Sequence, residues 1–81
     1  MSKKLLFLVV PYRASKGELY PAEPRRAESE PHALELAELL AARFPSVIVA
    51  ELILDEVTGD MDDPRILAVH GDVPEELAEA A

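Results

Sequence analysis

The sequence contains no cysteine and no tryptophan, and its aromatic residues are limited to two phenylalanines and two tyrosines. The absence of cysteine excludes a disulfide framework, a thiolate metal site and a cysteine nucleophile. It also fits a reducing compartment, and we expect the protein to be cytoplasmic. With so few aromatic residues, the core must be built mainly from leucine, isoleucine, valine and alanine.

A long apolar segment is also missing. The apolar run Leu5–Val10 follows two lysines, but it has only six residues and ends at Pro11. The core of a secretory signal or a membrane-spanning helix needs a longer run. We therefore expect a soluble protein without a membrane partner.

Basic residues are scarce relative to acidic ones. The chain carries 8 lysines and arginines against 16 aspartates and glutamates, which gives a formal net charge of −8. Residues 1–26 hold six of the basic residues and two acids, whereas residues 27–81 hold two basic residues and fourteen acids. This asymmetry predicts two electrostatically distinct surfaces. The overall sign disfavours direct binding of nucleic acid.

The length of 81 residues predicts one small domain over residues 1–81. Its first part has the pattern of a hairpin. Lys4–Tyr12 is apolar without alternation, so both faces of this strand should be buried. After a turn at Lys16-Gly17, Glu18–Glu23 can pair back, and Pro21 confines this second strand to an edge of the sheet.

The middle of the chain predicts a helix. Ser29 is suited to the N-cap, Pro31 is tolerated in the first turn, and Pro45 ends the helix. The apolar side of this helix should consist of Ala33, Leu36, Ala37, Leu40, Ala41 and Phe44, which follow one another at three- and four-residue spacing.

Two more strands and a short helix complete the expected fold. In Val47–Asp55, odd-numbered apolar residues alternate with even-numbered ones, and in Arg65–His70 strict alternation places Ile66 and Ala68 opposite Leu67 and Val69. Asp72 and Glu75 are suited to the start of a short terminal helix. The sequence therefore predicts an α+β fold of ββαββα order, with one mostly antiparallel four-stranded sheet packed by helices on one face.

The stretch between the last two strands is rich in carboxylates: Asp55, Glu56, Asp60, Asp62 and Asp63. A calcium-binding EF-hand loop fails in both possible registers, because Val57 and Gly59, or Pro64 and Ile66, fall where oxygen ligands are needed. We predict a solvated turn and no specific metal site. Weak cation binding, contact with a basic partner and mimicry of nucleic-acid phosphates remain the alternatives.

A second set of residues is basic and aromatic and lies near the first hairpin: Tyr12, Arg13, Lys16, Tyr20, Arg25 and Arg26. Tyrosine and arginine together can stack on a nucleotide and clamp its phosphate. The structural alternative is that Tyr12 and Tyr20 form a cross-strand pair and that the arginines bind acidic residues of the same chain.

No pattern indicates a catalytic residue or a cofactor. His32 and His70 lack the spacing of metal ligands, and we interpret both as structural or surface residues. No serine–histidine–aspartate arrangement can be singled out, and nothing places a carboxylate in an apolar pocket, as a general acid requires.

Two resemblances bear on function. The stretches "YRASKGELYPAEPRRAESEPHALELAELLAARFPSVIV" and "DEVTGDMDDPRILAVHGDVPEEL" resemble small acidic uncharacterised proteins of bacteria and their phages, which have a hairpin–helix–hairpin plan. This resemblance implies no catalytic residues, and it implies inhibition of host defence as one class of role. The segment "LFLVVPYR" is similar to the first strand and loop of nucleotide-binding α/β enzymes such as glycosyltransferases and nucleoside deoxyribosyltransferases. The clean helix would also suit a designed sequence, against which the many prolines argue.

Two functional hypotheses follow. The first is a non-enzymatic protein-interaction module with an acidic surface, which acts as an inhibitor or nucleic-acid mimic, binds a basic protein and forms a homodimer. The second is a small nucleotide-binding enzyme that uses the basic loop after the first strand. Hairpins on both sides of the helix would favour the first hypothesis, and parallel neighbouring strands would favour the second.

The homodimer is expected because the strands Leu5–Val10 and Val47–Leu54 are apolar on both faces. One helix and a short terminal helix can cover one face of a four-stranded sheet, and a bare aliphatic face exceeds what soluble monomers usually expose. The rival cover is the proline-rich segment Arg13–Glu28, folded over the open side.

Overall fold

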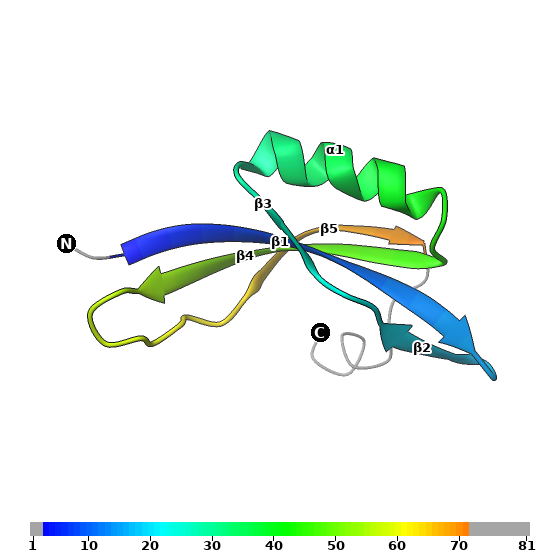
Figure 1. Ribbon diagram of the computed structural model, residues 1–81, viewed down its shortest axis with the longest axis horizontal. Coiled ribbons are helices and arrows are strands. Elements are labelled where there is room, and N and C mark those ends of the chain that lie inside the picture. Colours follow the sequence, from blue (N-terminus) through cyan, green and yellow to red (C-terminus); the bar gives the residue numbers. More distant parts are fainter. Residues whose placement is uncertain (1–2, 72–81) are drawn as a thin grey trace.

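The computed structural model describes residues 3–71 and has an α+β architecture, with one helix packed on one open sheet (Figure 1). Its elements are β1 (Lys3–Ser15), β2 (Glu18–Pro21), β3 (Arg25–Ala27), α1 (Glu30–Ala41), β4 (Ser46–Asp55) and β5 (Arg65–Gly71). The α+β class and the mostly antiparallel sheet agree with the prediction. The predicted terminal helix lies outside the described residues.

The sheet is organised around the long strand β1. Along one side, β1 pairs with β4 at ten successive positions, from Lys3↔Asp55 to Tyr12↔Ser46. Along its other side, it pairs with β2 at the hairpin end and with β3 near its middle, and β5 adds to the far side of β4. All of these pairings are antiparallel, and hairpins stand on both sides of α1.

The first hairpin is closed by a turn that the sequence predicted. Lys16 and Gly17 both have positive φ, 52° and 81°, between the paired residues Ser15 and Glu18. Two positive φ angles in a two-residue loop define a type I′ turn, whose twist matches that of the flanking strands.

The sheet has five strands where four were predicted, because the segment after Pro21 pairs with β1 a second time. The interruption lies at residues 22–24, and Pro24 has no N–H to donate to a ladder. Phe7 of β1 lies opposite Ala27, so β3 extends the sheet sideways. The segment Arg13–Glu28 therefore contributes edge strands, and it does not fold over the open face as the rival prediction required.

Helix α1 forms for the predicted reasons. The Ser29 side chain accepts a hydrogen bond from the backbone N–H of His32, and Pro31 stands in the first turn. Ala33, Ala37 and Leu40 are buried against the sheet. The helix ends at Ala41, three residues earlier than the apolar stripe suggested, and the N–H groups of Arg43 and Phe44 both donate to Leu40 O. No helix among residues 3–71 is long and apolar enough to cross a membrane.

Candidate functional site: the open face of the sheet

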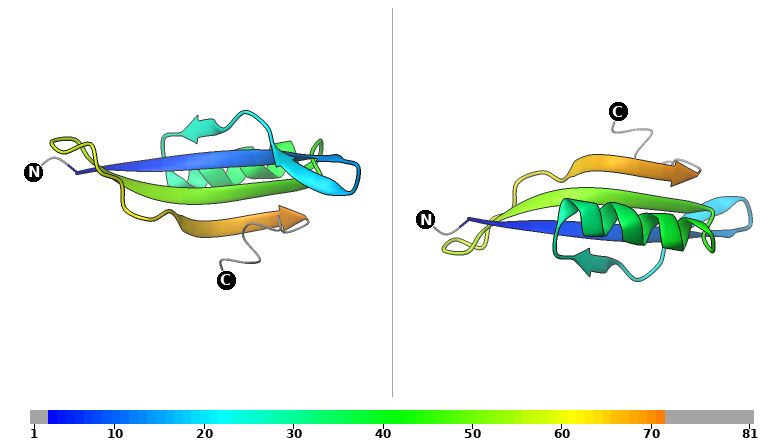
Figure 2. Two further views of the ribbon diagram at one scale, coloured as in Figure 1. Left: turned by 90° about the horizontal axis from the view of Figure 1, so that it is seen from below. Right: turned by 90° about the horizontal axis from the view of Figure 1, so that it is seen from above.

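The two faces of the sheet are covered differently. Figure 2 shows α1 over β1 and β4 on one side, whereas the view from the opposite side places α1 behind the sheet. Residues paired directly opposite one another share a face. The α1 side carries the core cluster of Phe7, Val9, Ala27, Val47 and Val49, which packs on the buried helix residues.

The face turned away from α1, hereafter the open face, is also apolar. Its aliphatic residues come from alternate positions of the two central strands and from β5: Leu6, Leu8, Val10, Ile48, Ala50, Leu52, Leu54, Ile66 and Val69. Lys4, Tyr12 and Ser46 lie on the same face. Ile66 and Val69 remain 41% and 40% exposed, whereas Ile48 and Ala50 at the centre of the face are buried, at 3% and 8% exposed. The remaining aliphatic residues of the face are half-buried. None of these side chains belongs to the core cluster under α1.

A β-bulge decides which residues of β5 reach the open face. Val49 pairs with Ala68, but the next residue, Ala50, pairs with Ile66, so Leu67 is the extra residue of the bulge. Leu67 and Ala68 both pack towards the core under α1, and Ile66 and Val69 both lie on the open face. The strict alternation predicted for this strand is therefore wrong, and the bulge gives the open face two aliphatic residues on β5.

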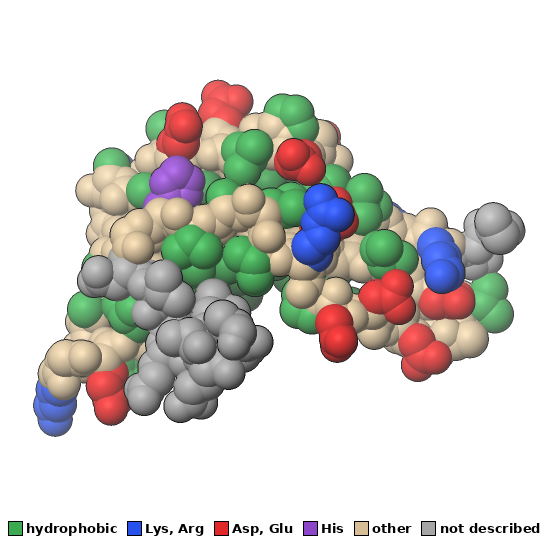
Figure 3. Space-filling model, turned by 180° about the vertical axis from the view of Figure 1, so that it is seen from behind, with side chains coloured by type: hydrophobic (Ala, Val, Ile, Leu, Met, Phe, Trp, Pro, Cys, Tyr) green, Lys and Arg blue, Asp and Glu red, His purple; other side chains and the backbone are tan. Residues whose placement is uncertain are grey.

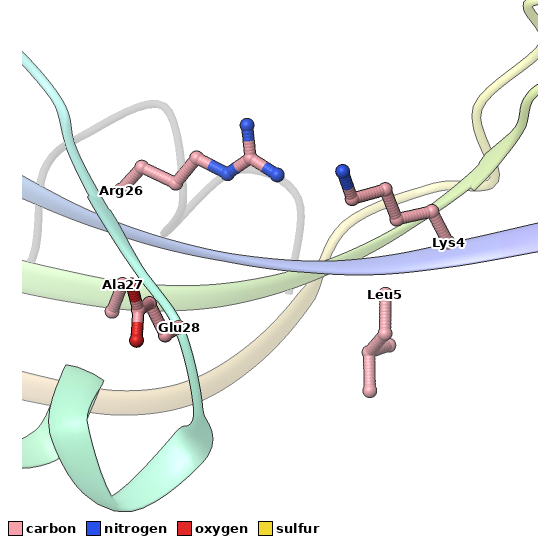
Figure 4. A pocket seen from close by; sticks show the side chains of 5 residues that line it. All are labelled: Lys4, Leu5, Arg26, Ala27 and Glu28. Atoms are coloured by element: carbon pink, nitrogen blue, oxygen red, sulfur yellow. The ribbon is translucent and has the colours of Figure 1, made fainter.

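Two cations lie at the β1–β3 edge of the open face. Lys4 lies opposite Leu54, and Arg26 lies opposite Leu8, which puts both on this face. Figure 4 shows their side chains directed towards one another, while Leu5 and Ala27 point to the side of α1. An open pocket of about 380 Å³ lies among these four residues and Glu28. Neither Lys4 nor Arg26 forms an ion pair with another described residue.

The carboxylate-rich stretch forms the connection between β4 and β5. Asp55 Oδ1 accepts hydrogen bonds from the backbone N–H groups of Val57 and Thr58, at 2.9 and 3.3 Å. The N–H of Gly59 donates to Asp55 O at 2.7 Å, and that of Asp55 donates to Asp60 O at 2.8 Å. Asp55 therefore organises a turn through its side chain and backbone.

The other acidic residues of the connection point to solvent. Glu56, Asp60, Asp62 and Asp63 are exposed, and the backbone of Asp62 donates to Ile53 O, so the stretch returns along the free side of β4. Within residues 3–71, no group of three or more potential ligands could hold a metal ion. Figure 3 shows several acidic side chains at this end of the molecule and others at the top and at the opposite end.

The six residues of the candidate nucleotide clamp do not converge on one site. Tyr12 and Arg26 lie on the open face, whereas Arg13, Tyr20 and Arg25 lie on the side of α1 and Lys16 lies in the turn. The predicted cross-strand pair of tyrosines does not form, because Tyr12 lies opposite Pro21 and Tyr20 lies opposite Arg13. The predicted ion pairs of the arginines with the acidic half are likewise absent from the described residues, where Arg65–Glu51, at 3.9 Å, is the one ion pair.

Arg13 and Tyr20 have local partners instead. The Arg13 guanidinium lies 5.2 Å from the centre of the Phe44 ring, a cation–π distance. The Tyr20 hydroxyl donates a 2.5 Å hydrogen bond to Glu18 Oε2. This bond, with a smaller contribution from burial, raises the pKa of Tyr20 above its ordinary value of 10.0. The first contact joins β1 to the segment between α1 and β4, and the second lies within β2.

The two histidines lie on different elements of the fold. His32 lies in the first turn of α1, where its Nδ1 accepts a hydrogen bond from the backbone of Glu28 at 3.3 Å. His70 lies in β5 opposite Val47. Neither lies in a group of metal-ligating residues within the described part of the chain.

Sequence reasoning overlooked three residues of the open face. Lys4 was treated as the start of a strand, although the register of the even-numbered residues Leu6, Leu8 and Val10 places it on their face. Ile66 and Val69 were assigned to opposite faces, and no local signal in Arg65–Gly71 announces the bulge.

No protein-family model, no curated protein and no solved structure matches the chain.

Proposed function

We propose that the protein is a non-enzymatic interaction module and that its open face is the surface that binds a partner. The carrying observation is the continuous aliphatic surface of β1, β4 and β5 on the side opposite α1. A soluble protein that keeps such a surface bare would expose more contiguous apolar area than monomers usually do.

The charged residues at the edges of the open face would make it selective for particular partners. The basic residues Lys4 and Arg26 lie at its β1–β3 edge, and the acidic connection between β4 and β5 lies at its other edge. An apolar centre with charged surroundings is the usual anatomy of a protein interface. A second copy of the chain and a basic protein are the two partners that these charges would accept.

The topology and the scattered basic residues support this proposal over a nucleotide-binding enzyme. Antiparallel hairpins flank α1, and β1 and β4 are antiparallel neighbours. Ligands of open α/β sheets bind at the carboxyl ends of parallel strands, a geometry that none of the described strand pairs has.

Quantitative affinity capture from an extract of the source cell tests the proposal. The bait is the full chain, either unchanged or carrying Val69→Lys on the open face. Leu39→Lys is the matched control, because Leu39 is 66% exposed on α1 and lies outside the open face. We expect a partner to be retained by the unchanged chain and the Leu39→Lys variant and lost with Val69→Lys. Equal retention by all three proteins would refute a role of the open face.

A further inference from the structure

We propose that the open face is occupied by a second copy of the chain, related by a two-fold axis that runs along the strands. This inference rests on the proposed function, and it adds the identity and orientation of the partner. In this arrangement, Lys4 and Arg26 of each copy face the acidic connection between β4 and β5 of the other copy.

The size of the open face suits a dimer. The ten paired positions of β1 and β4 make it about 30 Å long, at roughly 3.3 Å per residue. Neighbouring strands lie ~4.8 Å apart, so four strands make the face roughly 15–20 Å wide. The resulting area is of the same order as the ~800 Å² that each partner contributes to a standard interface.

The placement of the charges makes the face complementary to itself. Lys4 lies opposite Leu54 in the ladder, and Met61 forms a bridge with the same Leu54 from the other side of β4. Lys4 and the acidic connection therefore lie at the same end of the sheet and on opposite sides of β4, and Arg26, opposite Leu8, lies on the Lys4 side nearer the middle of β1. An isologous interface requires each surface patch to meet its complement under one two-fold rotation.

Only one direction of the axis uses both charged edges. A rotation about the strand direction keeps the ends of the two sheets together and exchanges their edges. The acidic connection of one copy then lies over Lys4 and Arg26 of the other, and this contact occurs twice. A rotation about an axis across the strands would instead exchange the ends and keep the edges, so that the acidic connection would lie over the Gly71 end of β5, away from Lys4 and Arg26.

The unpartnered state of the charges supports this orientation. Lys4 and Arg26 have no ion-pair partner among the described residues. The connection holds Glu56, Asp60, Asp62 and Asp63 with no basic residue between them. Two opposite charges that are each left without a partner in one copy attract one another across an interface, and they fix its register more than they add to its affinity.

Charge reversal tests the orientation. One full-length variant carries Lys4→Glu and Arg26→Glu, and a second carries Asp62→Lys and Asp63→Lys. In a dimer of either variant, the Lys4/Arg26 edge and the facing connection carry the same charge at both symmetry-related contacts. We therefore expect the dissociation constant of this dimer to rise about tenfold or more at low salt. When the two variants are mixed, opposite charges meet at both sites, and we expect a heterodimer with close to the original affinity. Arg13→Glu with Lys16→Glu is the control of equal charge change, and it should leave the dimer intact.

Light scattering and sedimentation over a range of concentrations provide the readout, and circular dichroism checks that each variant is folded. The unchanged protein should have about twice the 8.9 kDa chain mass. A monomeric mass at all concentrations would overturn the second copy as occupant. If the capture experiment still depended on Val69 in that case, the proposed function would stand without the dimer. A dimer that reversal of Lys4 and Arg26 does not weaken would overturn the orientation.

Discussion

The α1 side and the open face of the sheet have nearly the same aliphatic composition and different surroundings. Phe7, Val9, Val47 and Val49 face α1 and form a closed core with it, while their neighbours in sequence face the other way. A 12-residue helix is about 18 Å long, so it covers only the middle of one face. Leu5, on the α1 side but beyond the helix, is 50% exposed. The comparison teaches that alternation supplies two apolar faces, and that the placement of α1 decides which of them it covers.

Substitution of two adjacent residues of β1 gives the strongest test of this difference. Phe7→Ala removes a buried ring from the core under α1, and we expect it to lower the free energy of unfolding by about 3–5 kcal/mol. This loss should not depend on protein concentration. Leu8→Ala removes a half-buried side chain from the open face, and its cost should be smaller and should grow as the concentration, and with it the dimer, increases. Denaturant unfolding at several concentrations measures both effects, and identical behaviour of the two variants would show that the faces are equally covered.

Substitution of the glycine at the end of β5 tests how closely this strand must approach Pro45. Strand β5 contributes residues to both faces of the sheet. Gly71 has φ of +79°, and a Cβ atom there would stand 2.1 Å from Pro45 O. Gly71→Ala combines a left-handed conformation with a backbone clash, and we expect a loss of about 2–5 kcal/mol of stability.

Gly59→Ala is the matched control for this substitution. Gly59 has φ of +80° and no atom within 4 Å of the added Cβ, so only the conformational cost of about 1–2 kcal/mol applies. Thermal unfolding of the two variants separates the cost of the clash with Pro45 from the conformational cost that both substitutions share. Equal losses would mean that Pro45 moves away without cost.

The smallest expected effect concerns the two tyrosines of the first hairpin, which lie on opposite faces. The Tyr20 hydroxyl donates to the Glu18 carboxylate, and its deprotonation would bring two negative charges together. We expect Tyr20 to titrate above 10.0 and Glu18→Gln to lower its pKa towards that value.

The titration also has a defined effect on stability. Because the pKa of Tyr20 is raised in the folded state, this contribution is fully present below pH 10 and is lost as the pH rises through the folded-state pKa. Ultraviolet absorbance of a Tyr12→Phe background isolates the signal of Tyr20. A titration midpoint that Glu18→Gln does not change would contradict the role of the hydrogen bond.

The prediction from sequence succeeded where short-range patterns carry the information. Ser29 and Pro31 mark the start of α1 because a side-chain oxygen and a residue without an N–H suit the first turn. Lys16-Gly17 marks a two-residue turn, and the predicted turn between the last two strands forms around Asp55. The candidate clamp residues were grouped by their nearness in sequence, and the register of β1 with β2 and β3 distributes them over two faces.

The sequence by itself determined the α+β class, the helix with its cap, and two strands that are apolar on both faces, since each depends on residues within a few positions of one another. Only the tertiary structure decided that β3 pairs with β1, that α1 covers the face of Phe7, and that a bulge at Leu67 turns both Ile66 and Val69 to the open face. These features depend on pairing between residues that are distant along the chain. Such pairing satisfies backbone hydrogen bonds and buries side chains together, and it leaves no local periodicity from which the register could be inferred.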